Sequence, residues 1–96
     1  MVLTINFTDQ TKCLAFCNIN IDTDEPDAIL TAYQETIPKV HTPGYPGTAA
    51  QLLQEVTGIV MQEHPDMVVI SVNEDRKLSA PPEHTLNVEL VERYAN

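Results

Sequence analysis

The alternation of hydrophobic and polar residues along the chain predicts two pairs of strands separated by two helices. Residues 2–8 alternate between apolar and polar positions, which is typical of a strand with one covered face. Residues 12–21 repeat this period after a short polar turn, so the two stretches predict a β-hairpin. Residues 67–72 and 85–94 predict a second hairpin with a proline-containing loop. Because residues 67–72 are apolar at both parities, they favour a strand near the middle of a sheet.

A strong helical period begins after Thr48. Its apolar positions fall three and four residues apart, on one stripe of a helix: Ala49, Leu52, Leu53, Val56, Ile59, Val60 and Met61. Thr48 and Gln51 have the spacing of a capping box, which satisfies two amides at a helix start. Pro65 cannot continue a helix and disfavours helical geometry at His64, so the helix is predicted to end near Glu63.

A first helix is predicted from Ala28 to Ile37. Its apolar side consists of Ile29, Leu30, Ala32, Tyr33 and Ile37. Pro26 and the acidic residues around it are typical of a helix start. Pro38 is predicted to end the helix, because proline lacks the amide that a helix interior requires.

These elements predict one α+β domain spanning residues 1–96. The ββααββ order is most simply built as a two-layer sandwich. In that arrangement a four-stranded, mainly antiparallel sheet carries both helices on one face. The pattern does not determine the strand order, and a mixed sheet remains an alternative.

Charge narrows the range of functions. Fourteen aspartate and glutamate residues stand against five lysine and arginine residues, which gives a net charge of −9. Direct binding of nucleic acid or of an anionic membrane is disfavoured, because both need clustered basic residues. No stretch approaches the roughly 18 apolar residues of a membrane span, and residues 1–9 lack a signal-peptide pattern. We therefore expect a cytoplasmic protein, of the producing cell or of a virus-infected host.

The sequence contains no recognisable catalytic or metal-binding spacing. Cys13 and Cys17 lie four positions apart in a predicted strand, so their Cα atoms would be about 13 Å apart. A disulfide needs less than about 7 Å, so both are predicted to be reduced, buried thiols, with an intersubunit bridge or a reactive thiol as the alternatives. His41, His64 and His84 do not have the spacing of zinc ligands. We predict no metal, no cofactor and no catalytic residue.

Four acidic residues, Asp22, Asp24, Glu25 and Asp27, lead into the first helix. A calcium loop that began at Asp22 would need glycine at its sixth position and glutamate at its twelfth. The chain has Asp27 and Tyr33 there. The four acids are therefore interpreted as a solvated helix start that the helix dipole stabilises, and as candidate interface residues.

Two further surfaces are candidate interfaces. The loop 41–47 contains two Pro-Gly pairs, so Tyr45 and His41 could be presented at small entropic cost. The alternative is that Tyr45 folds back on the core. Leu14 and Phe16 share the outer parity of their strand, and if helices cover one face only, both would be exposed. A homodimer or higher oligomer is predicted through that face or through an edge strand.

These observations together predict a small, acidic, non-enzymatic interaction protein. It would present a negatively charged surface to a basic partner protein, as a viral or bacterial inhibitor or adaptor does. One alternative is an oligomeric small-molecule-binding protein, or a minor enzyme, with an intersubunit pocket near the Pro-Gly loop. Another is a structural subunit of a larger assembly. A third is that the acidic surface confers only solubility.

Overall fold

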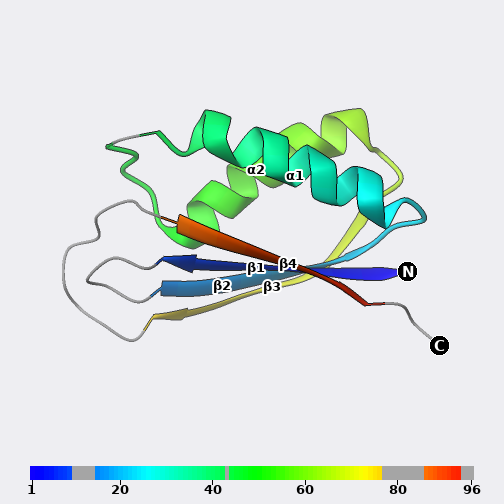
Figure 1. Cartoon of the computed structure of the whole chain (residues 1–96), viewed down its shortest axis with the longest axis horizontal. Coiled ribbons are helices and arrows are strands. Elements are labelled where there is room, and N and C mark those ends of the chain that lie inside the picture. Colours follow the sequence, from blue (N-terminus) through cyan, green and yellow to red (C-terminus); the bar gives the residue numbers. More distant parts are fainter. Residues whose placement is uncertain (10–14, 43, 77–85, 94–96) are drawn as a thin grey trace.

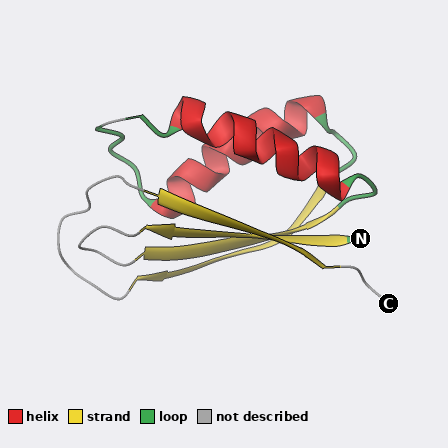
Figure 2. Cartoon of the chain, in the orientation of Figure 1, coloured by secondary structure: helices red, strands yellow, loops and turns green. Residues whose placement is uncertain are grey.

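The computed structural model describes residues 1–9, 15–42, 44–76 and 86–93 (Figure 1). Its elements, in chain order, are β1 (Val2–Asp9), β2 (Ala15–Asp22), α1 (Pro26–Val40), α2 (Ala49–Glu63), β3 (Val68–Arg76) and β4 (Leu86–Arg93). The predicted ββααββ order and the α+β class are confirmed. Both helices lie on one face of the sheet, as predicted (Figure 2).

The four strands form one antiparallel sheet in the order β3-β2-β1-β4. The first hairpin is confirmed, since β1 pairs with β2. The second hairpin is wrong, because β3 and β4 lie on opposite edges of the sheet. The nine residues between them, 77–85, can reach about 30 Å, whereas three strand spacings amount to about 14 Å. The linker is therefore long enough for β4 to pair with β1 instead of β3.

The placement of β3 corrects a second expectation. This strand was predicted near the middle of the sheet, and it is an edge strand. Just before it, Met67 is buried, and within it Val69 packs on the core. The other apolar residues, Val68, Ile70 and Val72, are 59%, 55% and 41% exposed. Residues 67–72 are therefore apolar at both parities even though the described residues bury only some of these side chains.

The core lies between the helices and the inner face of the sheet. The sheet contributes Leu3, Ile5, Phe7, Cys17, Ile19 and Ile21, and the helices contribute Ile29, Tyr33, Leu52, Leu53, Val56 and Val60. These six sheet residues are all odd-numbered and face inward because side chains alternate across a strand. Cys17 is fully buried among them, and Cys13 lies outside the described residues.

Helix α2 follows its sequence signals closely. It spans Ala49–Glu63. The Thr48 amide donates to the Gln51 side-chain oxygen at 2.8 Å, and the Gln51 amide donates to the Thr48 hydroxyl at 3.1 Å. The predicted capping box and the predicted end near Glu63 are both confirmed.

Helix α1 is longer than predicted. It begins at Pro26 and continues through Pro38 to Val40, so the predicted stop at Pro38 is wrong. Pro38 lies in the last turn, where the missing amide removes only one helical hydrogen bond. The turn still closes beyond it, because the His41 amide donates to the Ile37 carbonyl at 2.8 Å. Within the described ranges, no helix has the length and apolar character needed to cross a membrane.

Candidate functional site

The loop between the helices contains a tight turn that positions Tyr45. The Tyr45 amide donates to the Thr42 carbonyl at 3.0 Å, which closes the turn. Gly44 has a φ of +82°, a backbone conformation that side chains other than glycine rarely adopt. This turn orients the chain so that the Tyr45 ring packs against helix α2.

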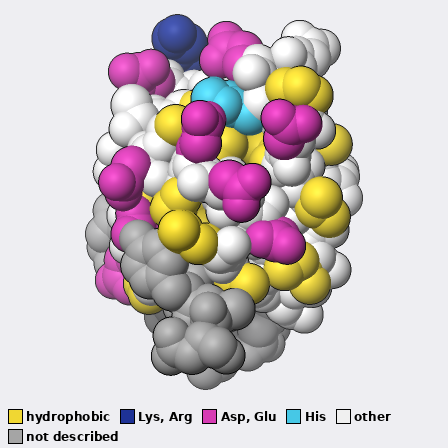
Figure 3. All heavy atoms as spheres, turned by 90° about the vertical axis from the view of Figure 1, so that its right-hand side faces the viewer, with side chains coloured by type: hydrophobic (Ala, Val, Ile, Leu, Met, Phe, Trp, Pro, Cys, Tyr) yellow, Lys and Arg dark blue, Asp and Glu magenta, His cyan; other side chains and the backbone are white. Residues whose placement is uncertain are grey.

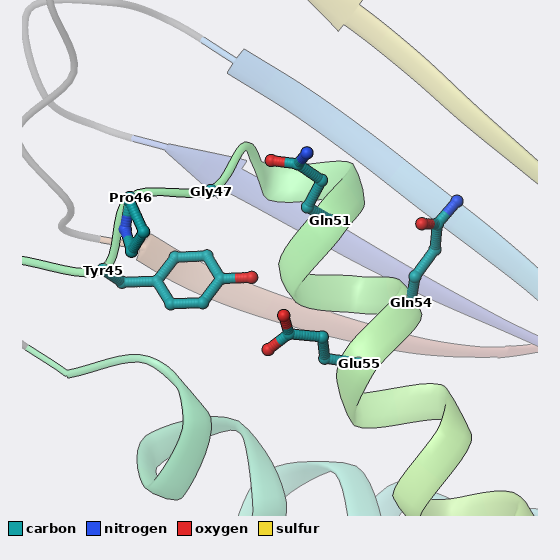
Figure 4. A pocket seen from close by; sticks show the side chains of 6 residues that line it. All are labelled: Tyr45, Pro46, Gly47, Gln51, Gln54 and Glu55. Carbon is teal, nitrogen blue, oxygen red and sulfur yellow. The ribbon is translucent and has the colours of Figure 1, made fainter.

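The Tyr45 ring packs on the backbone of Gly47 and reaches Glu55 of α2 (Figure 4). A Cβ atom at Gly47 would lie 2.5 Å from the Tyr45 Cε1 atom, so the ring requires glycine there. The Tyr45 hydroxyl donates a hydrogen bond to the Glu55 carboxylate. Burial, the Glu55 charge and this hydrogen bond together raise the pKa of Tyr45 above its ordinary value.

These residues border a hollow at the start of α2. It measures about 510 Å³ and is lined by Tyr45, Pro46, Gly47, Gln51, Gln54 and Glu55. The polar atoms of its wall come from two glutamine amides, a phenol and a carboxylate, as Figure 4 shows. Such a set can hydrogen-bond a small polar molecule.

The two candidate residues of this loop lie close together. The ring centroids of His41 and Tyr45 are 6.3 Å apart, with the planes tilted by 48°. Tyr45 is half-buried and packs against the core. Its role as an interface anchor stays a prediction. Sequence reasoning missed the part played by Glu55, although Gln51 and Glu55 are four residues apart on the polar side of a helix, which places them on one face.

The four acidic candidates lie at the junction of β2 and α1. Asp22, Asp24, Glu25 and Asp27 are all exposed. The Asp22 carboxylate accepts a hydrogen bond from the Met1 amino group at 3.1 Å, an exposed ion pair. Asp27 lies in the first turn of α1, where a negative charge interacts favourably with the helix dipole.

The fold brings two more acids, Glu63 and Asp66, to the same end of the molecule. Asp22 is opposite Val68 in the β2–β3 register, and Asp66 precedes Val68 by two residues. Glu63 and Asp27 line one hollow between α1 and α2. We call the six exposed residues Asp22, Asp24, Glu25, Asp27, Glu63 and Asp66 the acidic end.

Among the side chains that the structure describes, few positive charges lie near the acidic end. Lys39 and His64 line the hollow that Asp27 and Glu63 share. Lys39 is the sole lysine or arginine among the side chains that the structure describes. Figure 3 shows this end, where aspartate and glutamate side chains gather among hydrophobic ones. The six carboxylates of the acidic end outnumber Lys39 and the Met1 amino group that pairs with Asp22, so the described charges there favour a basic partner surface.

The uncovered face of the sheet is polar at its centre. The Thr4 hydroxyl donates to the Asn20 side-chain oxygen at 2.7 Å, and the Asn20 amide donates to the Ser71 hydroxyl at 2.9 Å. The Asn73 amide donates to the Asn18 side-chain oxygen at 3.0 Å. These cross-strand bonds link β1, β2 and β3, and they satisfy polar groups that an apolar interface would leave unpaired.

The apolar side chains predicted on this face are not among those that the structure describes. Leu14 lies outside the described residues, as does the side chain of Phe16, whose backbone belongs to β2 and is opposite Thr8. Their joint exposure therefore stays a prediction.

Within the described ranges, no three histidine, cysteine or acidic residues converge in a way that could hold a metal ion. No family model, no curated protein and no solved structure matches this chain.

Proposed function

We propose that this chain is a small, acidic, non-enzymatic interaction protein that binds a basic partner protein through its acidic end, as an inhibitor or adaptor. The observation that carries the proposal is the convergence of two acidic junctions that lie about 40 residues apart in sequence. We further propose that it acts in the cytoplasm of the producing or host cell.

Exposed carboxylates act mainly by steering and by selecting a partner of opposite charge. Complementary charge accelerates encounter and disfavours acidic competitors. The carboxylates of the acidic end lie in solvent, and the Debye length is about 8 Å at physiological ionic strength, so salt will screen them. Affinity for the partner should therefore fall steeply as salt rises.

The experiment begins with partners captured on the immobilised protein from its source cells at low salt. Binding of the captured protein is then measured across a salt series with Glu63→Lys and with Glu89→Lys. Both positions are exposed glutamates, but Glu63 belongs to the acidic end and Glu89 lies on β4. We expect Glu63→Lys to weaken binding at least several-fold more than Glu89→Lys.

Two results would contradict this proposal. Equal losses from both variants would mean that only the total charge matters. An affinity that does not change with salt would exclude electrostatic steering altogether.

The hollow beside Tyr45 supports a second candidate, a binding site for a small polar molecule. Its wall combines two amides with a phenol held by Glu55. A library of small polar compounds, screened by NMR, would test this candidate. Ligand-induced shifts confined to Tyr45, Gln51 and Gln54 would favour it, and no shift with any compound at millimolar concentration would count against it.

A further inference from the structure

Exposed hydrophobic side chains gather along one edge of the molecule. Among the described residues, seven large hydrophobic side chains are exposed, and Val68, Ile70 and Val72 of β3 are three of them. A fourth, Met61 of α2, is 42% exposed and lines the same groove as Val72. More than half of the exposed set thus lies on β3 or beside it.

The groove between α2 and β3 is almost entirely apolar. Its wall is formed by Ile19, Leu53, Gln54, Thr57, Gly58, Met61, Val69 and Val72. Gly58 leaves open space there, because a Cβ atom built on it would meet no atom within 4 Å. The helix layer therefore stops short of the edge strand, and apolar surface is left uncovered beside it.

The first five residues of β3 carry little of the protection that is usual at a sheet edge: apart from an irregularity at Ile70, the charged residues of the strand come only at its end, at residues 74–76. Among the strands that the structure describes, β3 pairs with β2 alone, so the backbone groups on its other side have no partner in these strands. Residues 68–72 contain neither charge nor proline. The extra residue at the register shift in this strand is Ile70, which is itself 55% exposed. The opposite edge, β4, carries Glu89 and Glu92, charges of the kind that discourage pairing.

We propose that a second copy of this chain covers this edge, with the two β3 strands paired antiparallel about a twofold axis. Centred on Ile70, pairing of that kind sets Val68 opposite Val72 and Val69 opposite Ser71 of the other copy, with no charged residue in the segment. The two sheets would join into one, and the two grooves would face each other. An uncharged strip offers a basic partner nothing to recognise, whereas it complements itself without like-charge repulsion.

The paired segment of this edge is short. Residues 68–72 are five residues of β3, so they extend over about 17 Å. With the groove beside them, they form a smaller face than the roughly 800 Å² per partner that stable interfaces bury. We therefore expect a weak dimer.

The test is sedimentation equilibrium of the full chain from micromolar to millimolar concentration. The parent protein should approach twice its mass of 10.7 kDa. Val68→Lys and Ile70→Lys place a charge on the edge and should raise the dimer dissociation constant at least tenfold. Val91→Lys is the matched control, because Val91 is 40% exposed on the opposite edge strand. It should leave the dissociation constant unchanged.

Hydrogen exchange of the parent protein gives a second measurement that needs no variant. In the dimer, the β3 amides that point away from β2 should exchange more slowly as concentration rises. A parent protein that stays monomeric at millimolar concentration would overturn the proposal. So would equal dissociation by Val91→Lys, fast exchange of those amides in a dimeric sample, or a dimer that only Phe16→Asp dissociates, since that would place the contact on the outer face.

Discussion

The Tyr33 hydroxyl lies 2.7 Å from the Thr57 Oγ1 atom, in the buried seam between α1 and α2. Thr57 donates its single hydroxyl hydrogen to the Leu53 carbonyl at 2.6 Å. Tyr33 is therefore the donor in the bond between the two side chains, because Thr57 has no second hydrogen to give. This relay connects the two helices through polar atoms inside an apolar core.

The relay predicts that Thr57→Val lowers the free energy of unfolding more than Tyr33→Phe does. Thr57→Val removes the acceptor and leaves a buried tyrosine hydroxyl unsatisfied, which should cost about 1–3 kcal/mol of unfolding free energy. Tyr33→Phe removes the donor while Thr57 keeps its bond to Leu53, and it should cost about 0.5–1.5 kcal/mol. Urea unfolding of both variants and of the double variant measures this. The double variant should lose less than the sum of the single losses; strict additivity would mean that the bond contributes nothing.

The buried phenol of Tyr33 predicts a loss of stability at alkaline pH. Burial raises the pKa of Tyr33 from 10.0 to about 12. The folded state therefore holds the phenolic proton more tightly than the unfolded chain does. The stabilisation is fully present below the unfolded pKa and is lost as pH rises through the folded pKa, by up to about 2–3 kcal/mol.

Unfolding free energy measured from neutral pH to about pH 12 would show this decline. Tyr33→Phe serves as the control, since it removes the titrating group and should flatten that part of the curve. An equally steep decline in Tyr33→Phe would assign the effect to other groups.

Gly47→Ala should displace the Tyr45 ring. The new Cβ atom would overlap ring atoms at 2.5–2.8 Å, so the ring must move and the bond to Glu55 should break. Because burial and Glu55 raise the pKa of Tyr45, that pKa should fall toward its ordinary value. Residue-resolved NMR titration of the tyrosines measures this. An unchanged Tyr45 pKa would mean that the ring does not pack on Gly47.

Gly58→Ala should increase the free energy of unfolding. Gly58 lies inside α2, and a Cβ atom there meets nothing within 4 Å. Alanine should therefore stabilise the helix by roughly 0.5–1 kcal/mol. The measurement belongs in the Ile70→Lys background, so that any association along β3 does not contribute. Destabilisation in that background would mean that the space beside Gly58 is not open.

Sequence reasoning succeeded where the determining interactions are local. The bounds of α2 follow from Thr48, Gln51 and Pro65, all of which act within one turn of the helix ends. The inward positions of β1 and β2 follow from strict alternation. The predicted stop at Pro38 was wrong because a proline in the last turn of a helix removes only one hydrogen bond. The sequence pattern does not show that the helix could accept this small loss of stability.

Sequence reasoning failed for features that depend on the order of the strands in the sheet. The apolar run 67–72 was interpreted as central because coverage by the same chain was assumed for both faces, yet β3 is an edge strand. The acids at 22–27 were visible in the sequence, but Glu63 and Asp66 join them only because β3 lies beside β2. The contact between Tyr45 and Glu55 likewise depends on how the loop returns to α2.

The pairing of β1 with β4 bears on how the chain acquires its structure during synthesis. Ile5 is opposite Leu90, so the inner strand β1 receives its second neighbour only after β4, far along the chain, has left the ribosome. Contacts between such distant segments slow folding, because a long loop must close before they form. Until then one side of β1 lacks its strand neighbour, and a chaperone would protect the protein during that interval.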